Sequence, residues 1–575
     1  MIFFAIYVII YDSLLCIMER LDLMENLTME QILFPNIDKT PADYEAMYPP
    51  RELPEGAKVT RFAPSPTGFL HFGSLFAAFI AAKTAGKDGV FYLRIEDTDK
   101  KREVENAVEG IVNGLKDFGI IPDEGAISDD AEIGAYGPYT QSRRTHIYKA
   151  FVKDLVAKGL AYPCFMTEEE IAGVRAMQEE QKVLPGIYGK YAKYRDITAD
   201  EAKKRIDAGE EYVVRLKSPG KPDGRIKFKD EVKGKIEIQE NILDIVLLKK
   251  DGTPTYHFAH AIDDHLMRTT HVTRGDEWLS SVPIHLQLFY VLGFKAPKYA
   301  HISPIMKEDA ETHGKRKLSK RKDPEAAVSF YAEAGYPAGA VNEYLMTIAN
   351  SNYEDWKRAN KTETIDKFPF ALNKTSKAGA LFDIVKLHDI SKTYISTLDT
   401  DTVYKAVTKW ANEYDDELYR LIAEDADYAH RIFSIERGSK KPRKDIGKWS
   451  EVKDYISYFY DDLFDGKREI AENIAAEDAI EILTRYSKLY DPAGAPEDWF
   501  PQVQELAAEL GFARSPKDYR NEPEKYKGHA GDVAGVIRAA VTGRLNTPDL
   551  FTIMQVLGAG KVQERITEAI NILKG

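Results

Sequence analysis

Residues 61–74, R-F-A-P-S-P-T-G-F-L-H-F-G-S, decide how the rest of the chain is organised. The stretch predicts the end of a short strand, a turn that two prolines stiffen, and the start of a helix. Gly68 and Gly73 lack a Cβ, so a ligand can come close to the backbone there. The free N–H groups at the helix start suit a phosphate chain, and His71 can donate hydrogen bonds to the same phosphates. These features are typical of a nucleotide-binding site. Without a second matching motif elsewhere in the chain, a structural loop would be the better interpretation.

A second stretch, residues 314–322, has the sequence G-K-R-K-L-S-K-R-K. Such a run of cations is usually a solvated loop or a nucleic-acid patch. Together, however, the two stretches resemble the paired signatures of class I aminoacyl-tRNA synthetases, H-F-G-S at 71–74 and K-L-S-K-R at 317–321. A-P-S-P-T-G, R-I-E-D-T-D at 94–99 and R-G-D-E-W-L at 274–279 resemble the glutamyl-tRNA synthetase family of bacterial type. The resemblance extends from about Lys58 to the C-terminus.

The composition describes an ordinary globular protein of several domains. The chain has 575 residues, 44% of them hydrophobic and 30% charged. A net charge of -13 argues against a broadly basic nucleic-acid binder but leaves room for a local basic track. Cys16 and Cys164 are the only cysteines, so we expect neither a disulfide framework nor a structural zinc site, and a cytoplasmic location.

The first 18 residues are strongly apolar. No Lys or Arg precedes the apolar core, Asp12 interrupts it, and no small-residue cleavage site follows, so a signal peptide is not indicated. The tract is also short for a membrane span. We interpret it as an upstream extension from a misplaced start, with Met18 or Met24 as the true start. A peripheral membrane contact is the alternative, and we expect no membrane partner.

The pattern predicts an α/β fold: a Rossmann-type parallel sheet split by an α+β insertion, followed by an all-α C-terminal region. The apolar run 90–95 has the length of a buried parallel strand and ends at the acidic cluster 96–99, where such sheets bind ligands. We expect helices at 103–118 and 168–181, and residues 254–260 to begin the second half of the sheet. The expected segments are an N-terminal extension (1–56), the first half of the catalytic domain (57–137), an insertion that by resemblance grips the tRNA acceptor end (138–254), the second catalytic half (255–300), the lysine-rich loop with a helical stem-contact region (301–390), and two helical anticodon-binding domains (391–470 and 471–575).

The resemblance implies glutamate–tRNA ligase activity. ATP activates glutamate to an adenylate with release of pyrophosphate, generally only when tRNA is present, and the 3' end of tRNA(Glu) then takes the glutamyl group. The protein mainly positions the reactants and neutralises phosphate charge, and Mg²⁺ travels with ATP without a protein-held metal site. By resemblance the catalytic residues are His71, Gly73, Lys317, Ser319 and Lys320. The ATP-binding residues are Thr67, Gly68, His71, Gly73, Glu277, Trp278, Lys317, Leu318 and Lys320.

The amino-acid pocket needs a cation for the substrate's side-chain carboxylate and an anion for its ammonium. Arg61 is the first candidate for the carboxylate and Arg274 the second, while Glu96 would bind the ammonium. The whole set of candidate glutamate-binding residues is Arg61, Ala63, Ser65, Glu96, Tyr256, His260 and Arg274. Many glutamyl enzymes have Asn where this chain has His260, so the contribution of this position to amino-acid specificity stays open.

The C-terminal third is expected to read the anticodon. Its candidate tRNA-binding residues are Lys440, Lys441, Arg443, Lys444, Arg538 and Arg544, with Trp449, Tyr455 and Tyr458 as aromatics that could stack on bases. A solvated loop followed by packed aromatics is the alternative for each, and the two last arginines could instead brace the final helical domain.

The sequence argues against three other functions. Glutaminyl-tRNA synthetases typically show P-P-E-P-N-G instead of A-P-S-P-T-G, and their anticodon-binding part is a β-barrel. Short relatives that modify an anticodon base lack the C-terminal part that this chain has. A catalytically silent tRNA-binding protein would not need the intact residues of both signatures. The sequence leaves charging of tRNA(Gln) open, and we expect a monomer.

Overall fold

The structure, a computed structural model, describes residues 27–66, 70–99, 104, 106–309, 311–319, 321–468, 470–471 and 473–575. The chain divides into two units, the first formed by residues up to Val328 with Leu345–Phe382, the second by Ser329–Tyr344 with Asp383–Gly575. No helix of the described residues is long and apolar enough to cross a membrane. The apolar tract of residues 1–18 lies outside the described residues.

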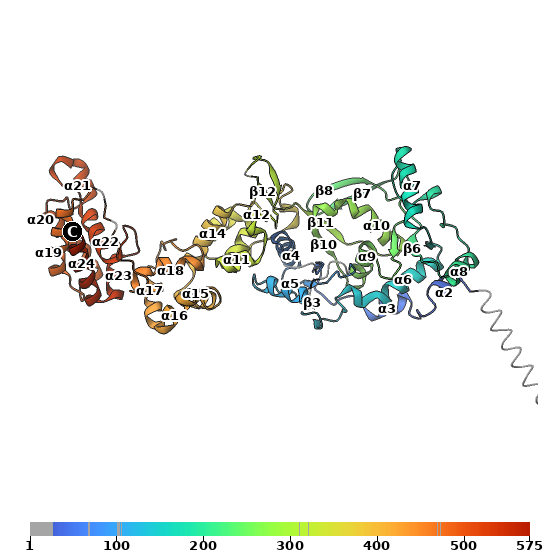
Figure 1. Cartoon of the computed structure of the whole chain (residues 1–575), viewed down its shortest axis with the longest axis horizontal. Helices are drawn as coiled ribbons and strands as arrows, with labels where there is room; N and C mark the ends of the chain where they lie inside the picture. The colour runs from blue at the N-terminus through green and yellow to red at the C-terminus, as the bar shows by residue number, and fades with distance from the viewer. Residues whose placement is uncertain are drawn as a thin grey trace, which may run out of the picture. The chain divides into compact units, whose positions relative to one another are not determined.

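A parallel sheet forms the centre of the first unit (Figure 1). β1 (Val59–Phe62), β2 (Val90–Leu93) and β3 (Glu124–Ala126) run parallel, with β4 (Glu132–Ile133) antiparallel at one edge. β10 (His271–Gly275) and β11 (Lys298–Ile302) form a second parallel pair. The Thr270 N–H donates to the Val59 carbonyl at 2.9 Å, which sets β10 beside β1. The halves of the sheet thus come from before and after a long insertion, as predicted for a split Rossmann-type fold.

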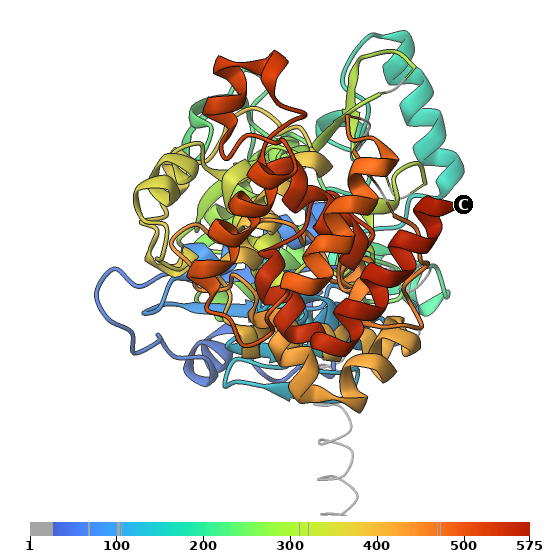
Figure 2. The ribbon, with the colours of Figure 1, turned by 90° about the vertical axis from the view of Figure 1, so that its left-hand side faces the viewer.

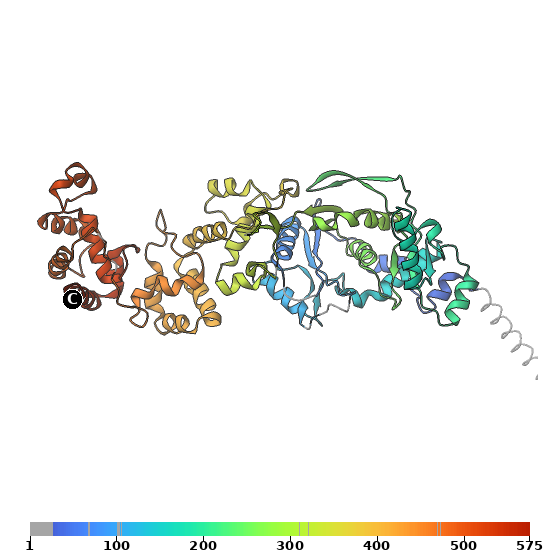
Figure 3. The same ribbon diagram turned by 45° about the horizontal axis from the view of Figure 1, so that its top comes forward.

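The insertion is a mixture of helices and antiparallel strands, as predicted. β5 (Ala161–Cys164), β6 (Val213–Leu216) and β9 (Val246–Leu248) form one antiparallel sheet. β7 (Arg225–Asp230) and β8 (Gly234–Gln239) form a separate two-stranded ribbon, which Figure 3 shows. The helices of this region are α6 (Thr145–Ala157), α7 (Glu168–Glu180) and α8 (Ala199–Asp207), so the helix expected at 168–181 is confirmed.

Two local predictions need correction. Residues 254–260 do not begin with a strand, because Tyr256–Leu266 form helix α9, in which Phe258, Ala259, Ala261 and Ile262 are all buried. This near-continuous burial hid the helical period in the sequence. The helix expected at 103–118 is shorter: α5 spans Ala107–Lys116 and is preceded by Asn106 in a left-handed conformation (φ 58°).

The second unit is built of helices, with no β-strand among its described residues (Figure 2). One of its cores gathers buried residues from 395 to 459 with Ile553 and Val556, and the other lies between residues 474 and 569. The predicted all-α C-terminal region is therefore confirmed. Its longer helices are α14 (Ile384–Thr397), α15 (Thr400–Tyr414), α16 (Asp416–Glu424), α17 (Ala426–Ser434), α19 (Ala476–Leu489), α20 (Pro496–Glu509), α22 (Ala530–Thr542), α23 (Leu550–Leu557) and α24 (Ala559–Lys574).

Candidate active site

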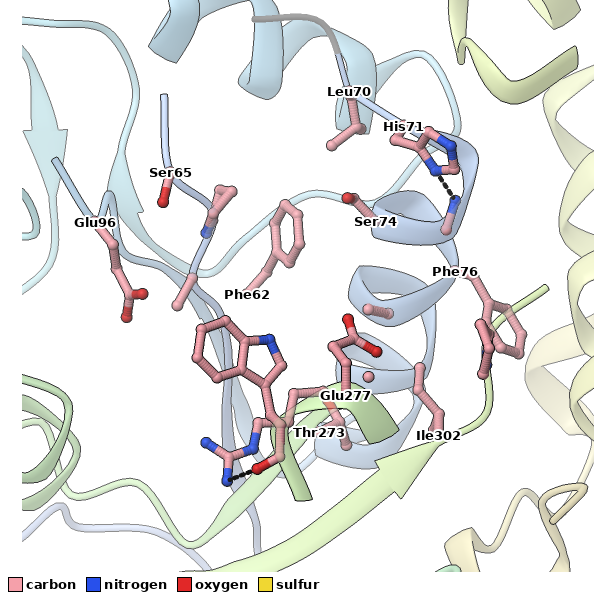
Figure 4. Close-up of a pocket in the computed structure, with 18 of the residues that line it drawn as sticks. Phe62, Ser65, Leu70, His71, Ser74, Phe76, Glu96, Thr273, Glu277 and Ile302 are labelled. Carbon is pink, nitrogen blue, oxygen red and sulfur yellow. Dashed lines mark hydrogen bonds between the residues drawn. The ribbon is translucent and has the colours of Figure 1, made fainter. Parts of the chain in front are cut away.

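A cavity of about 630 Å³ opens at the carboxyl ends of β1, β2, β10 and β11. Parallel sheets of this kind place ligands at this edge. Figure 4 shows Glu96 and Ser65 on one side of the cavity and His71 and Ser74 on the other. The cavity brings together most of the residues predicted from sequence: Arg61, Ala63, Ser65, His71, Gly73, Glu96, Tyr256, Arg274, Glu277, Trp278, Lys317 and Leu318.

Five predicted residues remain to be placed. Thr67, Gly68 and Lys320 lie outside the described residues. Ser319 and His260 are described but do not line the cavity.

His71 stands at the start of the long helix α4 (Phe72–Ala85). Its Nδ1 accepts a hydrogen bond from the Gly73 N–H at 2.9 Å, which Figure 4 marks. A neutral ring that accepts at Nδ1 carries its proton on Nε2. A Cβ at Gly73 would lie 3.2 Å from His71 Nδ1, so glycine at this position keeps the ring in place. The arrangement provides a helix N-terminus and an imidazole donor for an anionic ligand.

Two carboxylates hold the lysine-rich loop: Asp309, which accepts from Arg316 Nε at 3.0 Å, and Asp323. β12 (Met306–Glu308) and β13 (Lys315–Lys317) form a hairpin, after which the Leu318 N–H donates to the Ile305 carbonyl at 3.1 Å. Asp323 accepts hydrogen bonds from the Ser319 N–H at 2.8 Å and from both terminal nitrogens of Arg316 at 2.6 and 2.8 Å. The Arg316 guanidinium keeps the pKa of Asp323 well below its usual range. This anchor fixes the loop whose Lys317 and Leu318 line the cavity.

Buried charges support the wall of the cavity that carries Glu96 and Arg61. Arg94 is fully buried and donates to Asp264 Oδ1 at 2.6 Å and to Glu96 Oε1 at 3.0 Å. Arg61 Nε lies 3.5 Å from Asp264 Oδ2. Burial raises the pKa of the Glu96 carboxyl, and the positive charges of Arg94 and Arg61 oppose that rise. The sequence reasoning missed Arg94 and Asp264, although an arginine inside an apolar strand requires buried partners.

Arg274 has a different environment from Arg61 and Arg94. Its Nε donates to His301 Nε2 at 3.0 Å, one terminal nitrogen pairs with His285 Nδ1 at 3.1 Å, and the other donates to the Trp278 carbonyl at 3.4 Å. The guanidinium also lies over the Tyr299 ring, 4.8 Å from its centroid. Among the described residues no carboxylate lies within ion-pair distance of Arg274. Arg274 therefore lines the cavity without a counter-ion among the described residues, so its positive charge can bind an anionic ligand.

His260 is placed behind the cavity wall, contrary to the expectation that it contacts the substrate. It is fully buried, its Nε2 is 3.1 Å from the Tyr299 hydroxyl, and its ring stacks on Tyr256 with centroids 5.9 Å apart. Burial, followed by the positive charges of Arg274 and Arg61, lowers the pKa of His260 well below its usual value, so the ring is neutral. Tyr256, which lines the cavity and packs against Trp278 at 4.6 Å, separates His260 from it.

The predicted tRNA-binding residues of the second unit fall into different settings. Arg443, Lys444 and Arg544 line a separate cavity of about 460 Å³ with Tyr455 and Tyr458. Lys440 and Lys441 are exposed and do not line it. Arg538 donates to the Thr547 and Pro548 carbonyls at 3.2 and 2.8 Å, which braces the turn before α23. Trp449 and Tyr458 are buried in the helical core, so their rings serve packing.

Comparisons with known proteins identify the family of the chain. Residues 58–389 match the family described as "tRNA synthetases class I (E and Q), catalytic domain", and residues 521–570 match "Anticodon binding domain". A glutamate–tRNA ligase of Clostridium perfringens strain 13 is 53% identical over 94% of this chain and 100% of the relative, and one of Acetivibrio thermocellus is 47% identical over 94% and 99%. A crystal structure of a glutamate tRNA ligase from Elizabethkingia meningosepticum in complex with its amino acid has a TM-score of 0.70 and 28% identity, covering 90% of this chain and 99% of that chain. The chain thus belongs to the glutamate and glutamine group of class I tRNA synthetases.

Proposed function

We infer that the protein is a glutamate–tRNA ligase, an aminoacyl-tRNA synthetase that activates glutamate with ATP and transfers it to the 3' end of tRNA(Glu). The observation that carries the inference is that the same cavity has a helix N-terminus suited to phosphates on one side and Glu96 and Arg274 on the other. The near full-length likeness to glutamate–tRNA ligases supports the same activity.

We assign the ATP phosphates to the N-terminus of α4. His71 donates to them through Nε2, and Lys317 adds positive charge from the opposite loop. Thr67, Gly68 and Lys320 are assigned to the same role from the sequence signatures. Mg²⁺ would enter with ATP, through phosphate oxygens and water. No zinc is assigned to the insertion, because Cys164 is its only cysteine. The transition state gains negative charge, which these donors stabilise.

We assign the substrate ammonium to Glu96 and its side-chain carboxylate to Arg274. Asp264 already balances part of the charge of Arg61, and Arg94 shares the same carboxylate. The described neighbours of Arg274, in contrast, are neutral. A bound ammonium beside Glu96 would offset the effect of burial and favour the charged carboxylate. A carboxylate substrate is then preferred over its amide, because an amide would leave the Arg274 charge without a counter-ion.

The remaining assignments concern the parts of the chain that would contact tRNA. We assign residues 138–254 to the tRNA acceptor end and residues 391–470 and 471–575 to the anticodon. Arg443, Lys444 and Arg544 are the best placed for RNA, since they line one cavity. Lys440 and Lys441 could add phosphate contacts from the exposed loop. We further propose that the protein acts as a cytoplasmic monomer.

The test is charging of purified tRNA(Glu) and tRNA(Gln) with labelled glutamate. Charging of tRNA(Glu) is the expected result, and charging of both would identify an enzyme with relaxed tRNA choice. Binding of tRNA(Glu) without any charging would favour the alternative, a catalytically silent tRNA-binding protein.

A further inference from the structure

The hydrogen bonds of Arg274 leave a defined pair of donors for a substrate. An arginine side chain has five N–H donors and no acceptor. One, on Nε, is directed to His301; one terminal nitrogen gives a proton to His285 and the other gives one to the Trp278 carbonyl. One N–H therefore remains on each terminal nitrogen. One N–H on each of the two terminal nitrogens is the set of donors with which an arginine can bind a carboxylate in a bidentate way.

These contacts require a particular tautomer of His301. Because Arg274 Nε can only donate, His301 Nε2 must accept and cannot carry a proton. The ring proton is then on Nδ1, which lies 2.6 Å from Asp230 Oδ2. Asp230 is itself fixed, since its Oδ1 accepts from the Val232 and Lys233 N–H groups at 2.9 and 2.8 Å. Asp230 and His301 are both fully buried.

The hydrogen bonds of His285 also determine its tautomer. Its Nδ1 accepts from Arg274, so its proton is on Nε2, which lies 2.9 Å from His257 Nδ1. His257 accepts at that nitrogen and carries its own proton on Nε2. Neither ring can be doubly protonated without turning an acceptor into a donor that faces another donor.

We propose that Asp230, His301 and His285 are positioning residues that aim the free donor pair of Arg274 at the side-chain carboxylate of the amino acid. This rests on the proposed function, which makes Arg274 the ligand of that carboxylate. Asp230 is the last residue of β7, in the insertion, whereas Arg274 is on β10 of the catalytic sheet. The insertion thus contributes to amino-acid selection through one carboxylate that never touches the substrate.

The decisive variant is Asp230→Asn, which preserves the shape of the side chain. The amide oxygen must stay on the Val232 and Lys233 N–H groups, so the NH₂ group faces His301 Nδ1 and also replaces the oxygen that accepts from the His301 backbone N–H at 3.2 Å. His301 then has to accept at Nδ1 and carry its proton on Nε2, where it meets the Nε–H of Arg274. An Asp→Asn change beside a histidine acts by this switch of tautomer in serine proteases.

We expect Asp230→Asn to raise the KM for glutamate about 10- to 100-fold, the range for losing a hydrogen bond to a charged group. The KM for ATP rises far less than the KM for glutamate and kcat changes by no more than about threefold, because Trp278 is the one ATP-binding candidate that a described hydrogen bond joins to Arg274, and that bond is to its backbone carbonyl. Asp244→Asn is the matched control. Asp244 is also a buried carboxylate of the insertion and accepts from the Ser218 N–H and the Tyr162 hydroxyl, at 2.9 Å each, but has no link to Arg274.

A spectroscopic readout tests the wild-type protein directly. Nitrogen-15 NMR of histidine-labelled protein, with His301→Gln to identify the signal, should show His301 protonated at Nδ1. An Nε2-protonated His301 in the wild type would overturn the proposal, as would an Asp230→Asn variant with an unchanged KM for glutamate. An equal rise in the KM values for glutamate and ATP would overturn it too, because such a rise would mean that the variant disturbs the whole active site. A wild-type protein that charges no tRNA with glutamate would instead refute the proposed function, and the tautomer would still be readable.

Discussion

Neutralising Asp264 should destabilise the first unit strongly. The side chain is fully buried, its Oδ1 accepts from Arg94 at 2.6 Å, and its Oδ2 lies 3.5 Å from Arg61 Nε. The other nearby carboxylates are already engaged, Asp263 with Arg144 at 2.6 Å and Glu96 with Arg94 at 3.0 Å. Asp264→Asn keeps the volume of the side chain but leaves one buried positive charge uncompensated. Removing one partner of a buried ion pair costs about 3–5 kcal/mol, and we expect this loss in the free energy of unfolding.

The assay is urea unfolding of the full chain followed by circular dichroism, with hydrogen exchange of β2 and α9 amides to locate the loss. Asp207→Asn is the control, because Asp207 is an exposed acid paired with Lys203 on the surface of α8. That change should stay within about 0.5 kcal/mol. The pKa of Asp264 is lowered in the fold: burial would raise it, but Arg94 and Arg61 outweigh burial. Its stabilisation is therefore present above the ordinary Asp pKa and is lost as the pH falls through the folded value. A loss below about 1 kcal/mol in Asp264→Asn would show that Arg94 and Arg61 do not depend on this carboxylate.

Three further predictions concern catalysis. The KM for glutamate should be flat near neutral pH and rise in acidic solution. Glu96, whose pKa burial raises, gains its proton first. His257, whose pKa burial lowers to about 4, and His285, whose pKa burial lowers well below its usual value, stay neutral near neutral pH. A KM that falls on acidification would contradict this. Gly73→Ala should lower kcat about 10-fold, since its Cβ would displace the His71 ring, and pyrophosphate exchange at the wild-type rate would speak against that placement. Asp323→Asn should also lower kcat about 10-fold by releasing the lysine-rich loop, with the KM for glutamate unchanged; a change confined to that KM would be inconsistent with the anchor.

Much of the site could be predicted from the sequence because its motifs lie next to strand ends. Residues 61–74 begin with the last two residues of β1, residues 94–99 follow β2, and parallel strands bring their carboxyl ends to one edge. The two halves of the cavity, separated by the insertion, could be joined only through the family resemblance. Periodicity alone did not identify α9, whose residues 258–264 are all buried.

The partners of Arg274 could not be predicted from the sequence. His301 and His285 are single histidines in apolar segments, and Asp230 closes an exposed ribbon strand far from the motifs. Their relation exists only once β7, β10, β11 and α10 (Val282–Val291) pack together. The position of His260 was likewise undetermined, because the helix that carries it was not recognised.

We propose that one cavity binds ATP at the His71 end and glutamate at the Arg274 end. The sharpest test of this proposal is ATP–pyrophosphate exchange, measured with tRNA(Glu) present. We predict exchange that depends on glutamate in the wild type and falls at least about 100-fold in His71→Ala, as for the loss of a donor to developing charge. Exchange at the wild-type rate in His71→Ala, or exchange that does not need glutamate, would contradict the account.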